Sequence, residues 1–541
     1  MSTCSRIFCA FIFIWQVSLH ACEAPSLKEL CARSVAKKIL IEILVGVETI
    51  DAIALDKLAD LKQYRQFLET NKIEIDRLVT EKIEQMPICG DLKVYLLEGL
   101  KPIHRAIAKN QCSFFIDKRG QVYVCGDNRC GRLGLSGKEI IDVPTLVFIG
   151  TEKISEVVSQ DEQTFFLSSS GGVYACGNNK DGRLGLGDLI KAQTPTPILL
   201  PLTPGQGRVS SIYAWPSHTF LLTTEGQLFA FGSNHAGRLG LGHEGCVKAP
   251  CLVKLPDPHH RVIAVISQDN DSLFLTKAGH VYACGENNHG RLGLGDAEKR
   301  VSPTMIEHKY FHDQVVRAAL FFGGSYFLTA GGLVYRCGYS VDDNEEQHIP
   351  ADLDFGTIED DREKIIDIVS DGEIVFFLSD SGSVFVLGFF NRNILTDSFH
   401  PSYPSPTKLT VGAETTVVKK IIINNHRIFF LTSGWDVYAC GCNPNGQLGL
   451  GSKSSIVVPT MIDKKRKIKG KRSISIGKEH GFIHTRSGNI YVFGNNDKHQ
   501  LGMPQKQLIK PRDLLNNWWD RPYLSRILPL KEIPKRKPDQ P

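Results

Sequence analysis

The stretch that decides the fold is Val173–Asp188, which reads VYACGNNKDGRLGLGD. Related stretches recur at residues 122–137, 228–243, 281–296, 437–452 and 490–504, and weaker copies begin at Val334 and Val384. One glycine aligns in all eight copies: Gly126, Gly177, Gly232, Gly285, Gly338, Gly388, Gly441 and Gly494. The spacing of about 50 to 55 residues is in the range of propeller-type repeats. The period therefore predicts a ring of similar units that bury their faces against one another.

Each unit contains four short apolar runs of strand length. In the unit around Gly177 they lie at residues 154–158, 164–167, 173–177 and 194–198, with Gly171-Gly172 as the turn between the second and the third. Four short strands in about 50 residues make one propeller blade. We therefore predict an all-β fold over residues 101–515: a seven- or eight-bladed β-propeller of four-stranded blades.

Several residue types recur at fixed places after the repeat glycine. Leucines within the Gly-Arg-Leu-Gly turns are expected to fill the space between blades: Leu133, Leu184, Leu239, Leu292, Leu448 and Leu501. Asparagines two places after the glycine are expected to hydrogen-bond their own turn: Asn128, Asn179, Asn234, Asn287, Asn443 and Asn496. Because these residues occur in most units, only a role common to the whole ring explains them. They are predicted to be structural residues.

The chain has 15 cysteines, an odd number, and five of them directly precede a repeat glycine: Cys125, Cys176, Cys284, Cys337 and Cys440. Cysteines at one position of separate blades are held apart by the fold, which predicts buried free thiols. Such cysteine usage favours a reducing compartment, and hence a cytoplasmic or nuclear protein.

Residues 1–24 indicate a different location. Arg6 precedes the apolar run Ile7–Trp15, and small residues follow at Ala21, Cys22 and Ala24. This order is typical of a secretory signal peptide, although the run is too short to span a bilayer. The alternative is an apolar leader that is buried in the protein. Secretion and reduced thiols conflict, and the sequence leaves both locations open.

Residues 25–100 lack the repeat and form a predicted helical segment. Ser26 and Glu29 have the spacing of a capping box at the start of a helix. Leu27, Cys31 and Val35 then fall on one helix face, beside Leu30. This face is expected to bind a partner or to pack within the segment.

The stretch Ser26–Val35, SLKELCARSV, resembles an elongin-BC box, with Leu27, Cys31 and Val35 at its three anchor positions. The resemblance implies that Leu27, Leu30, Cys31 and Val35 bind elongin C, with a cullin as a further partner, as a short apolar helix face in a groove. In the stretch Leu58–Leu68, Leu58-Ala59 stands where the cullin-selecting element usually has Leu-Pro. This departure puts the cullin in doubt.

The repeat itself, a Val-Tyr-x-Cys-Gly strand followed by Asn-x-x-Gly-Arg/Gln-Leu-Gly, resembles the regulator of chromosome condensation family of β-propellers. Members of that family usually have seven blades, whereas eight glycines align in this chain. In the copies around Gly338 and Gly388, Ser340 and Phe390 replace the asparagine and the Gly-Arg-Leu-Gly turn is missing. The segment 339–406 is therefore predicted to form a partner surface, with neutral drift as the alternative.

Charge gives one further candidate site. The net charge of +5 is too small to require a polyanionic partner, but one basic run is dense: Lys464, Lys465, Arg466, Lys467, Lys469, Lys471 and Arg472. Such a run is typical of a nuclear import signal or of a patch for chromatin, nucleic acid or acidic protein. The alternative is a solvated loop. Residues 516–541 are predicted to be a basic, proline-rich tail.

The motifs of catalysis are missing from the sequence. The glycine pairs lie in blade turns, the cysteines and histidines lack zinc spacing, and no nucleophile elbow occurs. We therefore expect no catalytic, cofactor-binding or metal-binding residues and no membrane span. The predicted function is a non-enzymatic interaction scaffold, in its sharper form the substrate adaptor of an elongin/cullin-type ubiquitin ligase. The alternative is a guanine-nucleotide exchange factor or regulator for a small Ras-like GTPase, as the founder of the propeller family implies.

Overall fold

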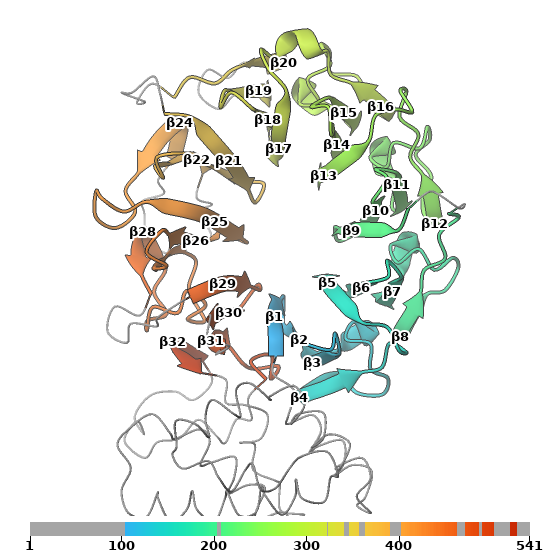
Figure 1. The fold of residues 1–541 in the computed structure, drawn as a ribbon, viewed down its shortest axis with the longest axis vertical. Helices are drawn as coiled ribbons and strands as arrows, with labels where there is room; N and C mark the ends of the chain where they lie inside the picture. The colour runs from blue at the N-terminus through green and yellow to red at the C-terminus, as the bar shows by residue number, and fades with distance from the viewer. Residues whose placement is uncertain are drawn as a thin grey trace, which may run out of the picture. The chain divides into compact units, whose positions relative to one another are not determined.

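A computed structural model describes residues 103–202, 207–321, 323–339, 346–355, 363–389, 402–462, 471–485, 490–502 and 520–526. The chain divides into two units after Lys101, and all described residues belong to the second. In these ranges the strands form eight four-stranded antiparallel sheets, arranged as the blades of a ring (Figure 1). The propeller is therefore confirmed, with eight blades. The predicted helical segment 25–100 lies outside the described residues.

Each blade consists of four strands that are consecutive in sequence. Blade 1 comprises β1 (Ile103–Lys109), β2 (Cys112–Asp117), β3 (Val122–Asp127) and β4 (Ile140–Val147), and blade 2 comprises β5 (Ile154–Gln160), β6 (Gln163–Ser168), β7 (Val173–Asn178) and β8 (Lys191–Pro197). Blade 3 comprises β9 (Val209–Ala214), β10 (His218–Thr223), β11 (Leu228–Gly232) and β12 (Val247–Leu252), and blade 4 comprises β13 (Val262–Gln268), β14 (Asp271–Thr276), β15 (Val281–Gly285) and β16 (Arg300–Met305).

Blades 5 to 8 repeat this order. They comprise β17 (Val315–Phe321), β18 (Gly324–Thr329), β19 (Val334–Tyr339), β20 (Glu346–Asp352); β21 (Ile365–Ser370), β22 (Ile374–Ser379), β23 (Val384–Phe389), β24 (Ser402–Leu409); β25 (Val418–Asn424), β26 (Arg427–Thr432), β27 (Val437–Gly441), β28 (Ile456–Met461); β29 (Lys471–Ile476), β30 (His480–Thr485), β31 (Ile490–Asn495) and β32 (Asp520–Arg526). Short 3-10 helices are η1 (Arg129–Gly131), η2 (Lys180–Gly182), η3 (His235–Gly237), η4 (Asn288–Gly290) and η5 (His308–Tyr310).

Strand order gives the ring two different faces. The first strand of every blade is innermost and the fourth is outermost (Figure 1). Because neighbouring strands are antiparallel, the first-to-second turns and the third-to-fourth connections lie on one face, which we call the exit face. The second-to-third turns and the connections between blades lie on the opposite face, which we call the entrance face.

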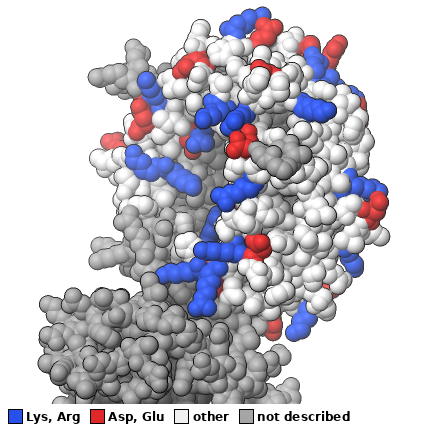
Figure 2. Space-filling view, turned by 45° about the vertical axis from the view of Figure 1, so that its right-hand side comes forward, with Lys and Arg blue, Asp and Glu red and all other residues white. Residues whose placement is uncertain are grey.

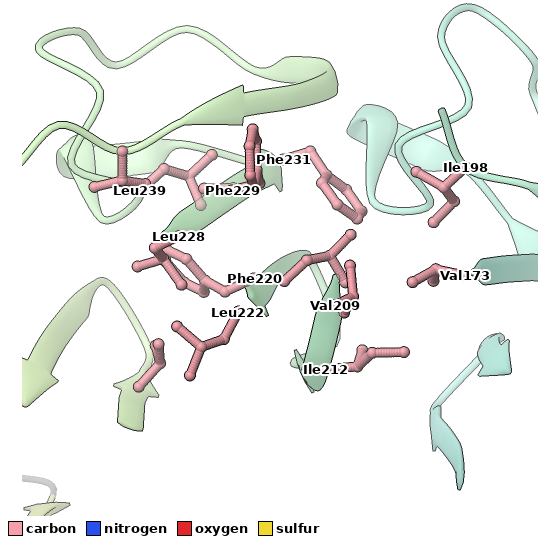
Figure 3. Packing of buried hydrophobic residues seen from close by; sticks show 14 of the residues in the cluster. Val173, Ile198, Val209, Ile212, Phe220, Leu222, Leu228, Phe229, Phe231 and Leu239 are labelled. Carbon is pink, nitrogen blue, oxygen red and sulfur yellow. The ribbon is translucent and has the colours of Figure 1, made fainter. Parts of the chain in front are cut away.

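The hydrophobic core lies between the blades. Second strands such as β6 and β10 are buried along their whole length. In the core of blades 2 to 4 (Figure 3), the ring centroids of Phe165 and Phe231 are 6.4 Å apart, and those of Phe220 and Phe274 are 5.6 Å apart. Both pairs join adjacent blades. Each blade is thus stabilised by its neighbours, as the repeat period predicts.

The repeat glycine is required by a close approach of the backbone. Gly177 has a φ of +113°, and a Cβ atom at this position would lie 2.0 Å from the carbonyl oxygen of Glu162 in the first-to-second turn. In all eight blades this glycine has a positive φ, and the added Cβ would meet the same turn carbonyl at 2.0 to 2.7 Å. Only glycine fits such a position. The glycine that marks the repeat therefore has a structural cause.

The turn that follows the glycine makes the predicted contacts. The Asn179 side chain accepts a hydrogen bond from the Leu184 N–H at 2.8 Å and donates to the carbonyl of Gly187 at 3.1 Å. The equivalent asparagine Oδ1 accepts from the leucine N–H in the other five complete turns. Leu184 is fully buried in the core between blades 2 and 3. Both structural predictions for the turn are confirmed.

The recurring cysteines are free and buried, as expected. Cys176 donates a weak hydrogen bond to the Arg132 carbonyl of the preceding blade at 3.4 Å, and Cys284 bonds in the same way to Arg238. Burial raises the pKa of the Cys440 thiol to about 12, so that this thiol is protonated at neutral pH. These cysteines act as small side chains between blades.

Blades 8 and 1 close the ring through side chains and share no strand. The Ala108 N–H donates to Ser475 Oγ at 2.9 Å, and the Ser113 hydroxyl lies 2.7 Å from His480 Nε2. The propeller was predicted to end at residue 515, but the fourth strand of blade 8, β32, spans Asp520–Arg526. It pairs with β31 but lacks the repeat motif, which is why the sequence did not reveal it.

Candidate interaction sites on the propeller

The sites predicted from the sequence lie mainly outside the described residues. This holds for Leu27, Leu30, Cys31 and Val35 of the elongin-box-like stretch, and for residues 464–469 of the basic run. Lys471 and Arg472 begin β29, the innermost strand of blade 8. Both sites remain predictions.

The described residues contain no group of three His, Cys, Asp or Glu side chains placed to hold a metal ion. Within the same ranges, no helix has the length and the apolar character needed to cross a membrane.

The arginine of the Gly-Arg-Leu-Gly turn links neighbouring blades. Arg132 Nη2 lies 2.6 Å from Asp127 Oδ2, and its Nη1 donates to the carbonyl of Asp161 in the next blade at 2.9 Å. Arg238 reaches the carbonyl of Asp269 in the same way. Arg132, Arg238 and Asp127 are buried, so their contacts stabilise the exit face. Little of these side chains is exposed for contact with a partner.

Blades 5 and 6 lack the Gly-Arg-Leu-Gly turn, but their second and third strands pair in the same register as in the other blades. Gly338 is opposite Gly324, and Gly388 is opposite Ile374, as in complete blades. The loss of the motif therefore affects the connections on the exit face and not the sheets.

The blades that follow an incomplete turn carry matching apolar substitutions. At two junctions that follow a complete turn, the carbonyl of the turn arginine accepts a side-chain hydrogen bond from the next blade: Arg291 accepts from Ser325 at 2.6 Å, and Arg183 accepts from Thr219 at 3.0 Å. At the position of these hydroxyls, blade 6 has Val375 and blade 7 has Ile428, both fully buried. A buried hydroxyl is stable only with a partner. The apolar residues thus compensate for the missing turns.

Polar side chains meet at the junction of blades 6 and 7 on the exit face. Asp371 and Glu373 belong to the β21–β22 turn, and His426 belongs to the β25–β26 turn. The His426 backbone N–H donates to Asp371 Oδ2 at 2.9 Å, and its ring nitrogens lie 3.6 Å from the carboxylates of Asp371 and Glu373. The Glu373 side chain is 41% exposed. We call Asp371, Glu373 and His426 the exit cluster.

A buried cation lies beneath the exit cluster. Arg427, the first residue of β26, is buried, which lowers its pKa, while Cys442, Glu479 and Asp371 favour its charged form. Glu479 is held from both sides, since it accepts hydrogen bonds from Gln111 of blade 1 at 3.2 Å and Asn495 at 2.9 Å. This arrangement provides fixed carboxylates around one arginine, and it suits binding of a polar protein surface.

The exit cluster was missed by the sequence analysis, although Asp371 and Glu373 belong to the segment 339–406 that was predicted as a partner surface. Asp371 and His426 are 55 residues apart, which is one repeat. A comparison of the residues in equivalent first-to-second turns is the signal that would have found them.

The fold defines a class of protein, the eight-bladed β-propeller of four-stranded blades. The regulator of chromosome condensation (RCC1) repeat model matches residues 170–222, 225–270, 278–329 and 436–483, which lie in blades 2 to 5 and in blades 7 and 8. Three relatives extend this finding. E3 ubiquitin-protein ligase HERC2 of Mus musculus is 29% identical over 359 residues, which are 63% of this chain and 7% of HERC2.

The other two relatives are human. RCC1-like G exchanging factor-like protein is 27% identical over 303 residues, covering 52% of this chain and 64% of the relative. Regulator of chromosome condensation is 26% identical over 404 residues, covering 72% of this chain and 83% of the relative. The chain thus spans a small part of HERC2, less than two thirds of the exchanging-factor-like protein, and most of the third relative.

Proposed function

We propose that this protein binds a small Ras-like GTPase through its propeller and regulates guanine-nucleotide exchange on it. The observation that supports this most is an RCC1-type propeller whose relatives include a protein named as an RCC1-like G exchanging factor-like protein. A fold alone does not determine a function, so binding of a GTPase requires a suitable surface on the propeller.

The exit cluster is such a surface. An exchange factor accelerates release by binding the nucleotide-free state of its GTPase more tightly than the nucleotide-bound state. In P-loop proteins a lysine pairs with the nucleotide phosphates, and it loses this partner when the nucleotide leaves. The half-exposed carboxylate of Glu373, beside Asp371, is suited to replace a phosphate as its partner.

A release assay tests this proposal. Small Ras-like GTPases loaded with a fluorescent GDP analogue are mixed with the full chain in the presence of excess GTP, and the fluorescence decay is followed. We expect at least a tenfold acceleration for one GTPase of the panel. If no GTPase releases its nucleotide faster and none binds in its nucleotide-free form, the proposal is wrong.

The adaptor function is a second proposal, which rests on the residues Ser26–Val35. The similarity to an E3 ubiquitin-protein ligase supports it weakly, because the matched region is 7% of that protein. Co-purification should recover elongin C with the wild-type chain and lose it with Leu27→Ala or Cys31→Ala. Equal recovery with both variants would exclude the elongin box. Either proposal places the protein in the cytoplasm or the nucleus.

A further inference from the structure

A basic residue recurs on the entrance face at the start of the innermost strands. Lys153, Arg208 and Arg261 directly precede β5, β9 and β13, and all three are exposed. Each side-chain stem packs on the second-to-third turn of the preceding blade: a Cβ atom added at Gly120 would lie 2.4 Å from Lys153 Cγ, and one at Gly171 would lie 2.5 Å from Arg208 Cβ. The stems thus lie against these turns, and the positive charges recur at three successive blade junctions.

Two further cations extend this series at its ends. Arg119 lies in the β2–β3 turn and Lys277 in the β14–β15 turn, and both are exposed. We call Arg119, Lys153, Arg208, Arg261 and Lys277 the basic arc, which covers blades 1 to 4. Figure 2 shows Lys and Arg side chains following one another over the face of the propeller, with few acidic residues among them.

Most charges of the basic arc have no ion-pair partner among the described residues. Arg261 pairs with Glu225 at 3.2 Å, and Arg208 Nη1 donates to the backbone carbonyl of Ser169 at 2.7 Å. Arg119, Lys153 and Lys277 form no ion pair with a described carboxylate. Unpaired cations in a row produce a local positive potential, although the net charge of the whole chain is small.

Three histidines from different elements meet at the blade 4 end of the arc. His260 precedes Arg261, His280 is the last residue of the β14–β15 turn, and His308 begins η5. The ring centroids of His260 and His280 are 4.3 Å apart, and those of His280 and His308 are 5.7 Å apart. We call them the histidine cluster.

The surroundings of the cluster favour the neutral imidazole of His280. His260 Nδ1 lies 2.7 Å from the Tyr282 hydroxyl, and its Nε2 lies 3.5 Å from Asp257. Burial lowers the pKa of His280, and His260 and His308 lower it further, whereas Asp257 acts in the opposite direction. His280 Nδ1 is buried without a hydrogen-bond partner. An anion bound here would favour the protonated form of His280.

We propose that the entrance face binds an acidic protein segment along the basic arc, and that the histidine cluster strengthens this binding as the pH falls. Single charges separated by a blade suit carboxylates spread along an extended polypeptide. None of the five arc residues is aromatic, so the arc offers no ring on which a nucleic-acid base could stack. The arc is on the opposite face from the exit cluster, so this inference is independent of the GTPase proposal.

Fluorescence anisotropy with a labelled peptide of 20 alternating Glu and Ser residues tests the inference on the full chain. The charge-reversal variant Lys153→Glu/Lys277→Glu should bind at least tenfold more weakly than wild type. The matched control Lys138→Glu/Lys180→Glu changes the net charge by the same amount, at exposed residues of the exit-face connections. Its affinity for the peptide should stay within twofold of that of wild type. Equal weakening of both variants, or no binding by wild type, would overturn the inference.

Two further measurements separate the alternatives. Wild-type affinity should rise at least threefold between pH 7.5 and pH 5.5, because the imidazoles take up protons and become positively charged. This gain should disappear in His260→Gln/His280→Gln/His308→Gln, since glutamine takes up no proton. A labelled single-stranded DNA of 20 nucleotides should bind more weakly than the peptide. Tighter DNA binding that is lost in the charge-reversal variant would assign the arc to nucleic acid and refute the proposal.

Discussion

At the scale of single residues, one position distinguishes the blades. The first residue of each second strand faces the invariant repeat glycine on the neighbouring strand, yet it differs from blade to blade. It is His218 in blade 3, Asp271 in blade 4, Arg427 in blade 7 and His480 in blade 8. The fold fixes the glycine through its backbone geometry and leaves the side chain opposite it free to vary. Polar residues there are buried under the exit face and set its electrostatics.

The two buried histidines predict a pH dependence of stability. His218 Nε2 lies 2.8 Å from Ser267 Oγ, and burial lowers the pKa of both His218 and His480 to about 3. In the unfolded chain both take up a proton near pH 6.5, so the unfolded state binds more protons below that value. Their contribution to stability is complete above pH 6.5 and is lost as the pH falls toward 3. Between pH 6.5 and pH 3, each histidine should lower the free energy of unfolding by about 1.4 kcal/mol for every unit by which the pH falls.

Urea unfolding at pH 7.5 and pH 5.5 measures this effect. Wild type should lose stability on acidification, and His218→Gln/His480→Gln should lose about 3 kcal/mol less, because glutamine does not take up the proton. An equal loss in wild type and variant would show that the two imidazoles are charged in the folded protein.

At the scale of the blade, contacts within one repeat were predictable from the sequence, whereas the cluster formed by two neighbouring repeats was not. The aligned glycines, leucines and asparagines predicted the blades and the contacts of their turns, because each of these residues acts within its own repeat or on the next. The exit cluster was not predictable in this way. Asp371 and His426 meet only because the ring places two equivalent turns side by side, and a motif search within one repeat does not contain that information.

Blades 6 and 7 provide a test of the compensation for the missing turns. Ile428→Thr places a hydroxyl at the site where Thr219 hydrogen-bonds a turn carbonyl in blade 3. In blade 7 we expect a loss of about 2 kcal/mol from the buried polar group and the lost packing. The matched change Thr219→Val should also destabilise, by about 1 to 2 kcal/mol, because it leaves the Arg183 carbonyl without its donor. Thermal unfolding measures both, and a neutral Ile428→Thr would argue for drift in blades 5 and 6.

At the scale of the whole molecule, the two candidate sites lie on opposite faces of the ring. The entrance face carries the basic arc, whose cations are mostly unpaired among the described residues. The exit face carries the carboxylates of Asp371 and Glu479, which act on Arg427, and the carboxylate of Glu373, which lies 3.6 Å from His426. The two proposals together predict that two partners bind at once, and that substitutions on one face leave binding at the other unchanged.

The most direct test of the account compares the two faces in the nucleotide-release assay, with the GTPase that the wild-type chain accelerates most. Asp371→Asn/Glu373→Gln should reduce the acceleration at least fivefold, because the carboxylates proposed to replace the phosphate lose their charge. The control Glu139→Gln/Asp142→Asn removes two exposed charges of blade 1, and the arc variant Lys153→Glu/Lys277→Glu alters the opposite face. Both should retain the wild-type rate. Full activity of the exit-cluster variant, or loss of activity in the arc variant, would contradict the assignment of the GTPase to the exit face.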